Sequence, residues 1–321
     1  MSTLRGYRRT NQSVGIRNHL FALPAVVCAN QVALDLARTN PRLKYIEHQH
    51  GCAQIGQDLT QTRQVFARLA LHPNVFASML IGLGCEGIVS KDLHQQAQVQ
   101  GLTPVDLVVI QEAGGTLGAQ RMVQSWVQRC GHEADNHQRE VISWTDLLIG
   151  VMVDTDTDTD NASLLIAKSL KALRDTGARL VVSEECRHLA TASGWPVATL
   201  NQPHVAETSY GEAAVGPITV MASGSNALET MTGLTSAGAH LILHFASLPH
   251  AFGSPLAPTV RWCVNEQCYL QFADDFDGRL RDELDVARLL EQVSRVICGQ
   301  VTKAEELGMD DFAMYRIGPT V

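Results

Sequence analysis

The sequence predicts an α/β protein: a parallel-sheet, Rossmann-like lobe followed by a second, smaller α/β lobe. Between residues 19 and 130, short apolar runs alternate with longer segments of helical period, the pattern of a parallel sheet covered by helices. The same alternation returns less regularly after residue 150. The length of 321 residues suits about two domains of roughly 150 residues. We therefore place the lobes at residues 1–150 and 151–321.

Four strand–helix units are expected in the first lobe. The clearest helix covers Asp58–Leu71, because apolar side chains recur there every three or four residues and form one stripe. The segment Lys91–Gln100 is polar on most faces, so solvent should cover that helix. The units, each a strand and then a helix, are Leu20–Cys28 and Gln31–Arg38, Leu43–His48 and Asp58–Leu71, Val75–Gly82 and Lys91–Gln100, and Val105–Gln111 and Leu117–Arg129.

The second lobe repeats the theme with longer connections. Its predicted strands and helices are Leu147–Val153, Ala162–Leu173, Arg179–Ser183, Ile218–Met221, Asn226–Ser236, His240–Phe245 and Val286–Ile297. Alternating carboxylates in Asp154–Asp160 suggest a calcium loop, yet Thr159 and Leu165 stand where an EF-hand needs Gly and Glu. A solvated turn is the other interpretation. Proline and glycine pairs between residues 187 and 217 indicate an irregular connection.

Composition excludes several classes of function. Acidic residues exceed basic ones, 33 to 25, for a net charge of −8, so no general basic surface exists to bind nucleic acid. No apolar run approaches the roughly 18 to 20 residues of a membrane span. The N-terminus lacks the apolar core of a signal peptide, so we expect a cytoplasmic protein. Its eight cysteines, with no Cys-x-x-Cys pair, are then thiols or ligands rather than disulfides.

Chemically active residues follow the predicted strands. They lie in the segments His48–Gln54, Gly82–Gly87, Gln111–Thr116 and Ser183–His188. Ligands of parallel α/β sheets gather at the carboxyl ends of the strands, so these segments should share one site. Thiolate and imidazole suit iron or zinc, and a neighbouring carboxylate can act as ligand or general base.

Individual residues keep alternative interpretations. Cys52 and Cys85 each follow a glycine in polar surroundings and are the favoured metal ligands, whereas the cysteines at 28, 130, 263, 268 and 298 read as buried hydrophobes. His48 and His50 alternate along an extended segment, so only one should reach the site. Glu86 and Glu112 are candidates for base or ligand, or else carboxylates that only stabilise a helix N-terminus.

Several of these segments together resemble one protein family. The motifs are Gly6-Tyr7-Arg8-Arg9, Gly15-Ile16-Arg17-Asn18-His19, His48-x-His50-Gly51-Cys52-x-Gln54, His72-Pro73-Asn74, Gly82-Leu83-Gly84-Cys85-Glu86, Gln111-Glu112-Ala113-Gly114-Gly115-Thr116, Thr232-Gly233-x-x-x-Ala237-Gly238-Ala239 and Gly253-Ser254-Pro255-x-Ala257-Pro258. In this order they resemble the altronate/galactarate dehydratases, a family that includes the large subunit of sulfolactate sulfo-lyase. The resemblance covers nearly all of residues 6–150 and resumes at Thr230–Pro258.

The resemblance implies a lyase that removes water, or sulfite, from a sugar acid or related hydroxy acid. It also implies iron, as a mononuclear Fe²⁺ ion or an iron–sulfur cluster, although another divalent metal would serve. Under this interpretation Arg17 clamps the substrate carboxylate. The assigned roles are catalysis for Glu86, Glu112 and His50; substrate binding for Arg17, Asn18, Gln54, Gly114 and Gly115; and metal binding for Cys52, Cys85, His48, Cys186 and Glu184.

The chain also departs from the family pattern. Met152–Asp156 replaces a Lys-Cys-Gly-Gly-Ser-Asp segment, Ser183–Arg187 keeps only the Ser-Glu of a Ser-Glu-Thr-Pro-Glu segment, and later glycine motifs are missing. In one interpretation, Cys186 together with Asp154 or Asp156 rebuilds the site for another substrate. In the other, the chain is a degenerate paralogue that acts as a ligand-binding or regulatory subunit. The family further implies a small β-rich, SAF-like module, here expected as a separate subunit, and a homo-oligomer.

Overall fold

The computed structural model describes residues 3–52, 54–100, 103–154, 160–192 and 206–318, which form two compact lobes. The first lobe contains Tyr7–Glu140 and the end of the chain from Phe312, and the second contains Val141–Asp311 and the first six residues. The division falls at residues 140 and 141 rather than at 150, because the strand Leu148–Val153 is the central strand of the second lobe. A small sheet of β1 (Arg5–Arg8), β2 (Val14–Gly15) and β7 (Glu140–Val141) includes the residues around this division.

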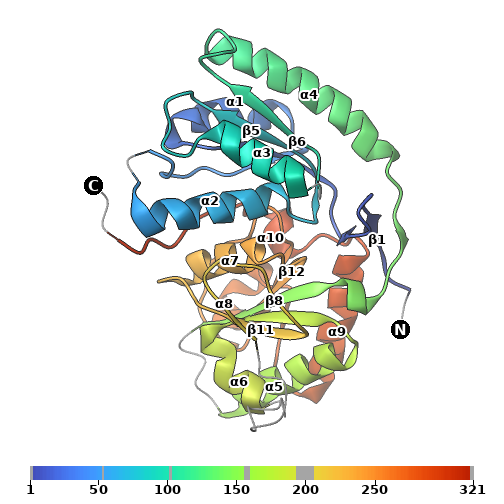
Figure 1. Ribbon diagram of the computed structural model, residues 1–321. Helices are drawn as coiled ribbons and strands as arrows, with labels where there is room; N and C mark the ends of the chain where they lie inside the picture. The colour runs from blue at the N-terminus through green and yellow to red at the C-terminus, as the bar shows by residue number, and fades with distance from the viewer. Residues whose placement is uncertain (1–2, 53, 101–102, 155–159, 193–205, 319–321) are drawn as a thin grey trace. The chain divides into compact units, whose positions relative to one another are not determined.

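The first lobe is a four-stranded parallel sheet of order β4-β3-β5-β6. Its strands are β3 (His19–Pro24), β4 (Leu43–Tyr45), β5 (Val75–Gly82) and β6 (Val105–Val109). Its helices are α1 (Asn30–Thr39), α2 (Gly56–Ala70), α3 (Ser90–Gln100) and α4 (Thr116–Asn136). Helices α1 and α4 contact one another, as do α2 and α3 (Figure 1).

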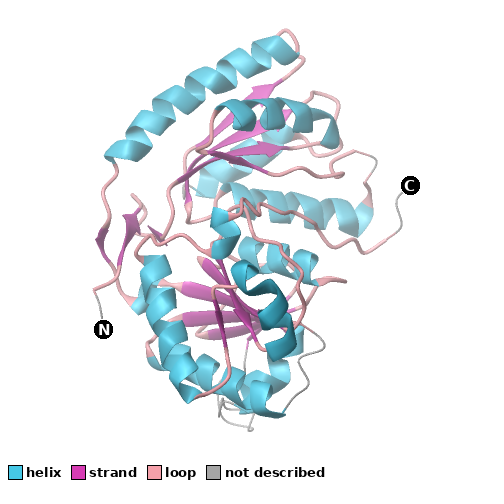
Figure 2. Ribbon diagram, turned by 180° about the vertical axis from the view of Figure 1, so that it is seen from behind, coloured by secondary structure: helices cyan, strands magenta, loops and turns pink. Residues whose placement is uncertain are grey.

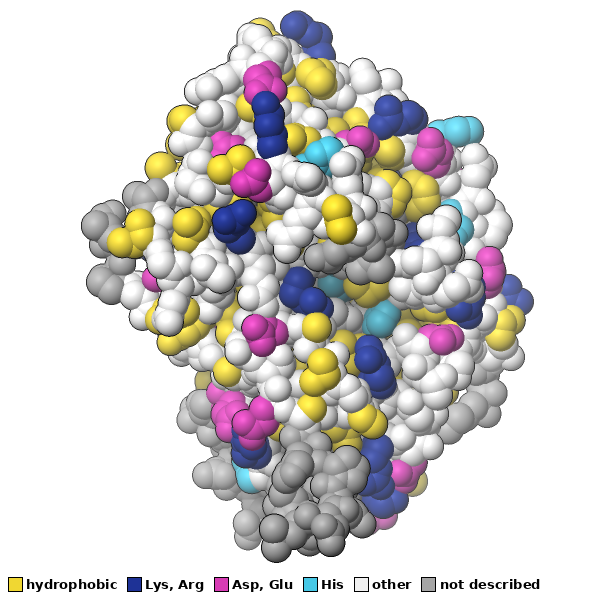
Figure 3. All heavy atoms as spheres, viewed as in Figure 1, with side chains coloured by type: hydrophobic (Ala, Val, Ile, Leu, Met, Phe, Trp, Pro, Cys, Tyr) yellow, Lys and Arg dark blue, Asp and Glu magenta, His cyan; other side chains and the backbone are white. Residues whose placement is uncertain are grey.

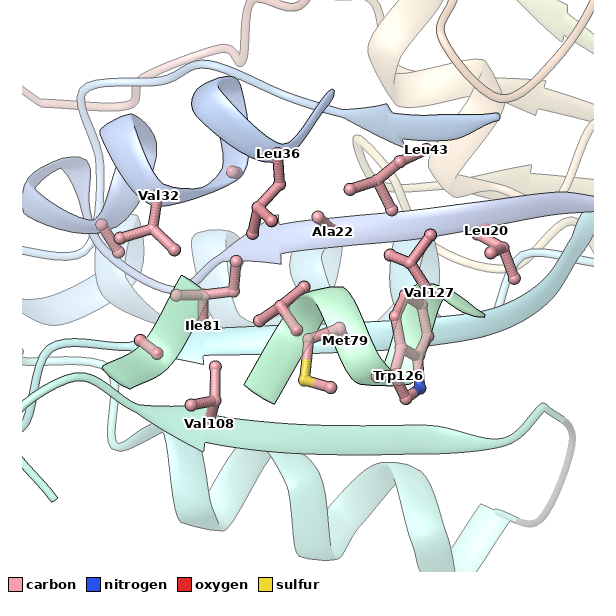
Figure 4. Close-up of a cluster of buried hydrophobic side chains, with 14 of the residues drawn as sticks. Leu20, Ala22, Val32, Leu36, Leu43, Met79, Ile81, Val108, Trp126 and Val127 are labelled. Atoms are coloured by element: carbon pink, nitrogen blue, oxygen red, sulfur yellow. The ribbon is translucent and has the colours of Figure 1, made fainter. Parts of the chain in front are cut away.

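One face of this sheet is sealed by α1 and α4. Side chains at alternate positions, such as Leu20 and Ala22 of β3 and Met79 and Ile81 of β5, pack against Trp126 and its neighbours in the helices (Figure 4). The amphipathic stripe predicted for α2 is also confirmed, since its buried positions recur at three- and four-residue intervals.

The second lobe contains a seven-stranded parallel sheet of order β10-β11-β9-β8-β12-β13-β14. The strands are β8 (Leu148–Val153), β9 (Arg179–Ser183), β10 (Ala206–Thr208), β11 (Ile218–Met221), β12 (Leu241–Ala246), β13 (Thr259–Cys263) and β14 (Gly278–Arg279). The helices are α5 (Asp160–Asp175), α6 (Arg187–Ala192), α7 (Ala227–Ser236), α8 (Glu266–Phe272), α9 (Glu283–Ile297) and α10 (Lys303–Glu306). Short 3-10 turns cover Val27–Ala29, Trp144–Asp146, Glu184–Cys186 and Ala273–Asp275.

The predicted α/β class with two parallel-sheet lobes is confirmed, and in Figure 2 the strands of each sheet lie among helices. The second lobe is not the smaller one, however, because it holds seven strands against four. The sequence analysis missed β13, where Arg261 interrupts the apolar run. It also extended the first strand to Cys28, although β3 ends at Pro24, and it expected Cys28 to be buried, although that residue is exposed.

Strand order places a topological switch point in each sheet. In the first lobe, the chain moves from β3 to β4 on one side and then to β5 on the other. In the second lobe, it moves from β8 to β9 on one side and later returns to β12 on the other. Loops leave in opposite directions at such a point, so a crevice opens beyond the carboxyl ends of the two strands, where ligands of open α/β sheets bind.

The helices and the surface charges of the described residues agree with the composition. None of the described helices is both long and apolar enough to cross a bilayer. On the face shown in Figure 3, Lys and Arg side chains are scattered among acidic ones rather than gathered in one basic patch.

Candidate active site

In the first lobe, the chain itself occupies the switch point. The carbonyl of His50 accepts a hydrogen bond from the backbone N–H of Val27 beyond β3, at 3.0 Å. The next carbonyl, of Gly51, accepts from the N–H of Gly87 beyond β5, also at 3.0 Å. The loop after β4 thus bridges the loops after β3 and β5, and its backbone lies across the crevice.

Gly51 is required for this bridge. Its φ is +90°, which L side chains rarely adopt. A Cβ at this position would lie 2.2 Å from the carbonyl oxygen of Ala25. Only glycine lets the loop lie this close to the end of β3.

The two histidines of the loop lie together but are both buried. The N–H of His50 donates to Nδ1 of His48 at 3.1 Å, so Nε2 of His48 carries the proton and donates to the carbonyl of Pro24 at 2.8 Å. With both nitrogens engaged, the described conformation of His48 offers no lone pair to a metal ion. Burial lowers the pKa of His48 to about 4 and that of His50 to about 3, so both rings are neutral at pH 7.

Gln54 and Glu86 hold the same loops in place. The Oε1 atom of Gln54 accepts from the N–H of Gly51 at 2.9 Å, and its amide nitrogen lies 3.3 Å from Nδ1 of His50. Oε2 of Glu86 accepts from the N–H groups of Leu83 and Gly84, at 3.1 and 2.5 Å. Burial of Glu86 opposes its ionisation, but hydrogen bonds from Gly84, Ser90 and nearby backbone outweigh burial and lower its pKa. The described contacts therefore give both side chains a structural role.

The other candidates of this lobe face solvent or lie elsewhere. Glu112 is exposed and forms a 2.5 Å ion pair with Lys91, while Gly114 and Gly115 form the turn into α4. Arg17 and Asn18 precede β3, at the amino edge of the sheet. Arg17 donates to the carbonyl of Ile16, and Asn18 links Arg9 to the carbonyl of Ala134.

This placement separates the predicted substrate clamp from the cysteine loops. Cys52 and Cys85 lie beyond the carboxyl ends of β4 and β5, and both are exposed. Strands of six to eight residues put the two edges roughly 20 Å apart. The described structure therefore does not bring Arg17 together with these cysteines, and its role as substrate clamp stays a prediction.

In the second lobe, the switch point is open. A pocket of about 490 Å³ lies beyond the carboxyl ends of the central strands, within the size range of small-molecule sites. Its walls come from residues 152–154 after β8, Glu185 after β9, residues 224–228 between β11 and α7, and residues 250–252 after β12. All of these residues belong to one lobe.

Asp154 forms the floor of the pocket. Its side chain is only 5% exposed, Oδ1 accepts from Nε2 of the fully buried His244 at 2.7 Å, and Oδ2 accepts from the backbone N–H groups of Ser247 and Leu248, at 2.9 and 3.2 Å. Burial alone would raise the pKa of Asp154. Hydrogen bonds from His244 and the two amides outweigh burial, so its pKa is lowered and the floor of the pocket is anionic.

A second carboxylate, Glu185, lines the pocket from the 3-10 turn that follows β9. Oε2 of Glu185 accepts from the hydroxyl of Ser223 at 2.6 Å, and no contact of Oε1 is found among the described residues. Glu184 and Cys186, the adjacent residues that were predicted as metal ligands, make other contacts. Glu184 forms an exposed ion pair with Arg187 at 2.6 Å. Cys186 is fully buried, and burial raises the pKa of its thiol to about 12, which disfavours the thiolate that a metal needs.

An imidazole, that of His250, stands at the exposed end of the pocket. Its loop is anchored from behind by Arg261 of β13, which is fully buried and donates to the carbonyls of His250 and Asp275. Phe252 of the same loop stacks on His244, with ring centroids 5.3 Å apart. Glu185, His244 and His250 were not among the residues predicted from the sequence, although Glu185 and His250 follow predicted strands and His244 lies within one.

The donors predicted for a metal do not converge. In the described parts of the chain, no three His, Cys, Asp or Glu side chains come together as a metal site requires. Glu184 and Cys186 belong to the second lobe, and the other predicted ligands belong to the first. Asp156, suggested as a replacement ligand, lies outside the described residues.

Comparison with known proteins decides the family. A model described as "D-galactarate dehydratase/Altronate hydrolase, second domain" matches residues 6–135, and one described as "D-galactarate/Altronate dehydratase, C-terminal" matches residues 201–320. The chain belongs to the galactarate/altronate dehydratase family. The first match falls almost entirely on the first lobe and the second match mainly on the second lobe, so both lobes carry the relationship.

Relatives within the family differ in length. Altronate dehydratase of Bacillus subtilis is 29% identical over 160 residues, 46% of this chain and 31% of that protein, and altronate dehydratase of Escherichia coli is 38% identical over 90 residues, 25% and 18%. The chain thus spans less than a third of either. The protein named (2R)-sulfolactate sulfo-lyase subunit beta, of Chromohalobacter salexigens, is 24% identical over 390 residues, covering 98% of this chain and 97% of that one. A solved S. aureus MnaA–UDP structure aligns with a TM-score of 0.30 at 9% identity over 92% of this chain and all of that one.

Two of the segments in which the chain departs from the resembled pattern contribute to the pocket. The segment Met152–Asp156 supplies Asp154, and the segment Ser183–Arg187 supplies Glu185. The segments around Gly51 and Glu86, which carry the resemblance in the first lobe, hold the loops beyond β3, β4 and β5.

Replacement of Gly51 should test the closed switch point. We expect Gly51→Ala to lower the free energy of unfolding by about 3 kcal/mol or more, because backbone strain and steric overlap with Ala25 combine. Gly56→Ala is the matched control, since φ is +59° there and a Cβ would meet nothing within 4 Å; it should cost only about 1 kcal/mol. Urea unfolding measures both, and equal costs would contradict the close approach.

The buried histidines predict acid sensitivity. Their pKa values are about 4 and about 3 in the folded state, against 6.5 for a free imidazole. Between these values the unfolded chain binds protons that the folded chain does not, so stability falls as pH falls below about 6.5, by up to about 1.4 kcal/mol per pH unit for each histidine. His50→Gln should flatten the loss in urea unfolding at pH 7, 6 and 5, whereas the exposed His132→Gln should not. An unchanged slope for His50→Gln would show that His50 titrates normally.

Proposed function

We propose that this chain is a lyase that eliminates water, or sulfite, from a sugar acid or related hydroxy acid. The observation that carries the proposal is the open pocket at the second switch point, with an anionic floor, a second carboxylate and an imidazole. Membership of the dehydratase family, through both lobes, supports the same reaction class.

The pocket contains the groups that an elimination requires. A base must remove the proton next to the substrate carboxylate, and an acid must protonate the departing hydroxyl. Glu185 is the proposed base, because Ser223 fixes one of its oxygens and orients the other. His250 is the proposed acid, since an imidazole can donate a proton to a departing group and Arg261 fixes the backbone that carries it. Asp154, held by His244 and two amides, binds and orients the substrate.

Iron remains part of the proposal only as a cofactor to be tested. The resemblance to the family implies it, and it would act as a Lewis acid on the departing group. The described donors do not fit a protein-bound iron, because no three of them converge. No step above depends on a metal.

A ligand-binding or regulatory subunit is the second candidate. It is favoured by one observation: Glu86 and His48, two of the residues predicted to be active, are engaged in holding loops. We also propose a separate small subunit, since the relative of matching length is named a subunit, along with assembly into a homo-oligomer in the cytoplasm. Co-purification from the native host tests these proposals.

Turnover assays separate the two candidates. We expect the chain, alone or with its small subunit, to convert D-altronate, galactarate or (2R)-sulfolactate to the keto acid. The keto acid is measured by derivatisation with a carbonyl-specific reagent. Glu185→Gln should lower kcat by about 10²- to 10⁴-fold, the contribution of a general base. Glu291→Gln, an exposed carboxylate of α9 paired with Arg295, is the control and should leave kcat unchanged.

The same assay tests the residues predicted from sequence. Loss of activity in Glu112→Gln but not in Glu185→Gln would move the reaction to the first lobe. Substrate binding without turnover, in the presence of iron and the small subunit, would favour the binding-subunit role.

Metal content tests the cysteine prediction. Protein purified without oxygen or chelator and supplied with Fe²⁺ should retain iron if Cys52 and Cys85 are ligands, and Cys52→Ser and Cys85→Ser should each lose it. Cys298→Ser, a half-buried thiol, is the control. Iron that survives both serine variants, or that never binds, would contradict the predicted ligand set; elemental analysis and the absorption spectrum give the answer.

A further inference from the structure

The second lobe contains a group of buried polar atoms without partners. Among its described residues, the buried side-chain atoms with no hydrogen-bond partner are Nδ1 of His244, Oγ of Ser247 and Nε of Arg261. These residues are 0%, 6% and 0% exposed. Nearly all buried polar groups in folded proteins form a hydrogen bond, so three exceptions in one neighbourhood indicate that the groups act together.

All three residues adjoin Asp154 and the loop that follows β12. His244 and Arg261 are register partners in the adjacent parallel strands β12 and β13, so their backbones lie about 4.8 Å apart and their side chains leave the same face of the sheet. The N–H of Ser247 donates to Asp154 at 2.9 Å, and His244 donates to the same carboxylate at 2.7 Å. Arg261 donates to the carbonyl of His250, three residues beyond Ser247.

The unpartnered atoms are complementary. Nε–H of Arg261 only donates, a serine hydroxyl both accepts and donates, and Nδ1 accepts in a neutral His244 ring whose Nε2 donates to a carboxylate. Rotation of Ser247 about its Cα–Cβ bond moves the hydroxyl between staggered positions and leaves the backbone N–H on Asp154. Hydrogen bonds can therefore run in one direction, from the guanidinium through the hydroxyl and the imidazole to the carboxylate.

We propose that these three side chains form one hydrogen-bonded chain with Asp154 and hold it as a permanent anion. The chain joins a buried cation to a buried anion through two neutral groups, and buried charges require such pairing. Burial lowers the pKa of Arg261, but the negative charges of nearby carboxylates, Asp154 among them, oppose this effect. The guanidinium thus stays charged at the start of the chain.

The chain gives the two carboxylates of the pocket different roles. This inference rests on the proposed function, in which a carboxylate removes the substrate proton. Both oxygens of Asp154 accept hydrogen bonds, so a proton on either oxygen would displace a donor and leave the charge of Arg261 without its counterpart. Asp154 is therefore a fixed charge, and the half-buried Glu185 is the carboxylate that takes up the proton. None of the three other members of the chain is among the described residues that line the pocket, so they are positioning residues.

¹⁵N NMR of the full chain with labelled histidine tests the chain without a substrate. At pH 7 we expect the His244 ring to hold one proton, on Nε2, and to accept a hydrogen bond at Nδ1; His244→Gln assigns its resonances. Ser247→Ala should move the Nδ1 resonance toward that of an unbonded acceptor. Ser169→Ala is the matched control, because this fully buried hydroxyl of α5 donates to the carbonyl of Leu165, and it should leave both His244 resonances in place. A ring proton on Nδ1, or an Nδ1 resonance that Ser247→Ala leaves unchanged, would overturn the chain.

Turnover separates this inference from the proposed function. In an active enzyme, Ser247→Ala should lower kcat about three- to tenfold, the usual contribution of one hydrogen bond. Arg261→Lys, which keeps the charge, should retain more of kcat than Arg261→Gln, which keeps only a donor; equal losses would contradict the role of the charge. If the NMR result is as expected but no sugar acid is converted, the lyase proposal fails and the chain stands. If a sugar acid is converted but the NMR result is not as expected, the chain fails and the lyase proposal stands.

Discussion

The arrangement of the second lobe depends on one carboxylate. Asp154, directly after β8, accepts hydrogen bonds from His244 within β12 and from two amides of the loop that follows β12, so it joins the two strands that flank the switch point. These bonds fix the start of the loop from Ser247 to Phe252, and Arg261 holds it again at the carbonyl of His250. A buried anion is costly unless it is paired and hydrogen-bonded, and here its partners are also the elements that form the pocket wall.

The two lobes solve the same geometric problem in opposite ways. Each sheet opens a crevice where strand order reverses. In the first lobe, backbone carbonyls of His50 and Gly51 satisfy amides on both sides of the crevice. In the second, a side chain satisfies the amides on one side only. In the first lobe, the amides beyond the strands bond to backbone carbonyls that lie across the crevice. In the second lobe, they bond to a carboxylate, so a pocket remains and its floor is negatively charged.

The sequence was sufficient for the fold class and for most elements, because burial periodicity and strand–helix alternation are local properties. Val75–Gly82, Arg179–Ser183 and Ile218–Met221 occur with the predicted bounds. The site was harder, since it depends on which loops meet. Glu184 forms an exposed ion pair, whereas the adjacent Glu185 lines the pocket. The sequence alone cannot reveal which of two adjacent carboxylates faces the pocket. The sequence shows a glycine at position 51 but not the contact that requires it. The carbonyl oxygen that a Cβ at this position would meet belongs to Ala25, 26 positions away.

Neither lobe is a continuous stretch of chain. The carboxylate of Asp58, at the start of α2, accepts from the N–H groups of Ile317 and Gly318, and Gln61 of the same helix donates to the carbonyl of Tyr315. In the second lobe, Ile142 donates to the carbonyl of Leu4. During synthesis on the ribosome, the first lobe therefore waits for the last segment to emerge before these contacts can form, although its sheet is translated first. The two lobes therefore complete their folding together. A cut at residue 140 would yield two fragments, each without the terminal segment that completes its lobe.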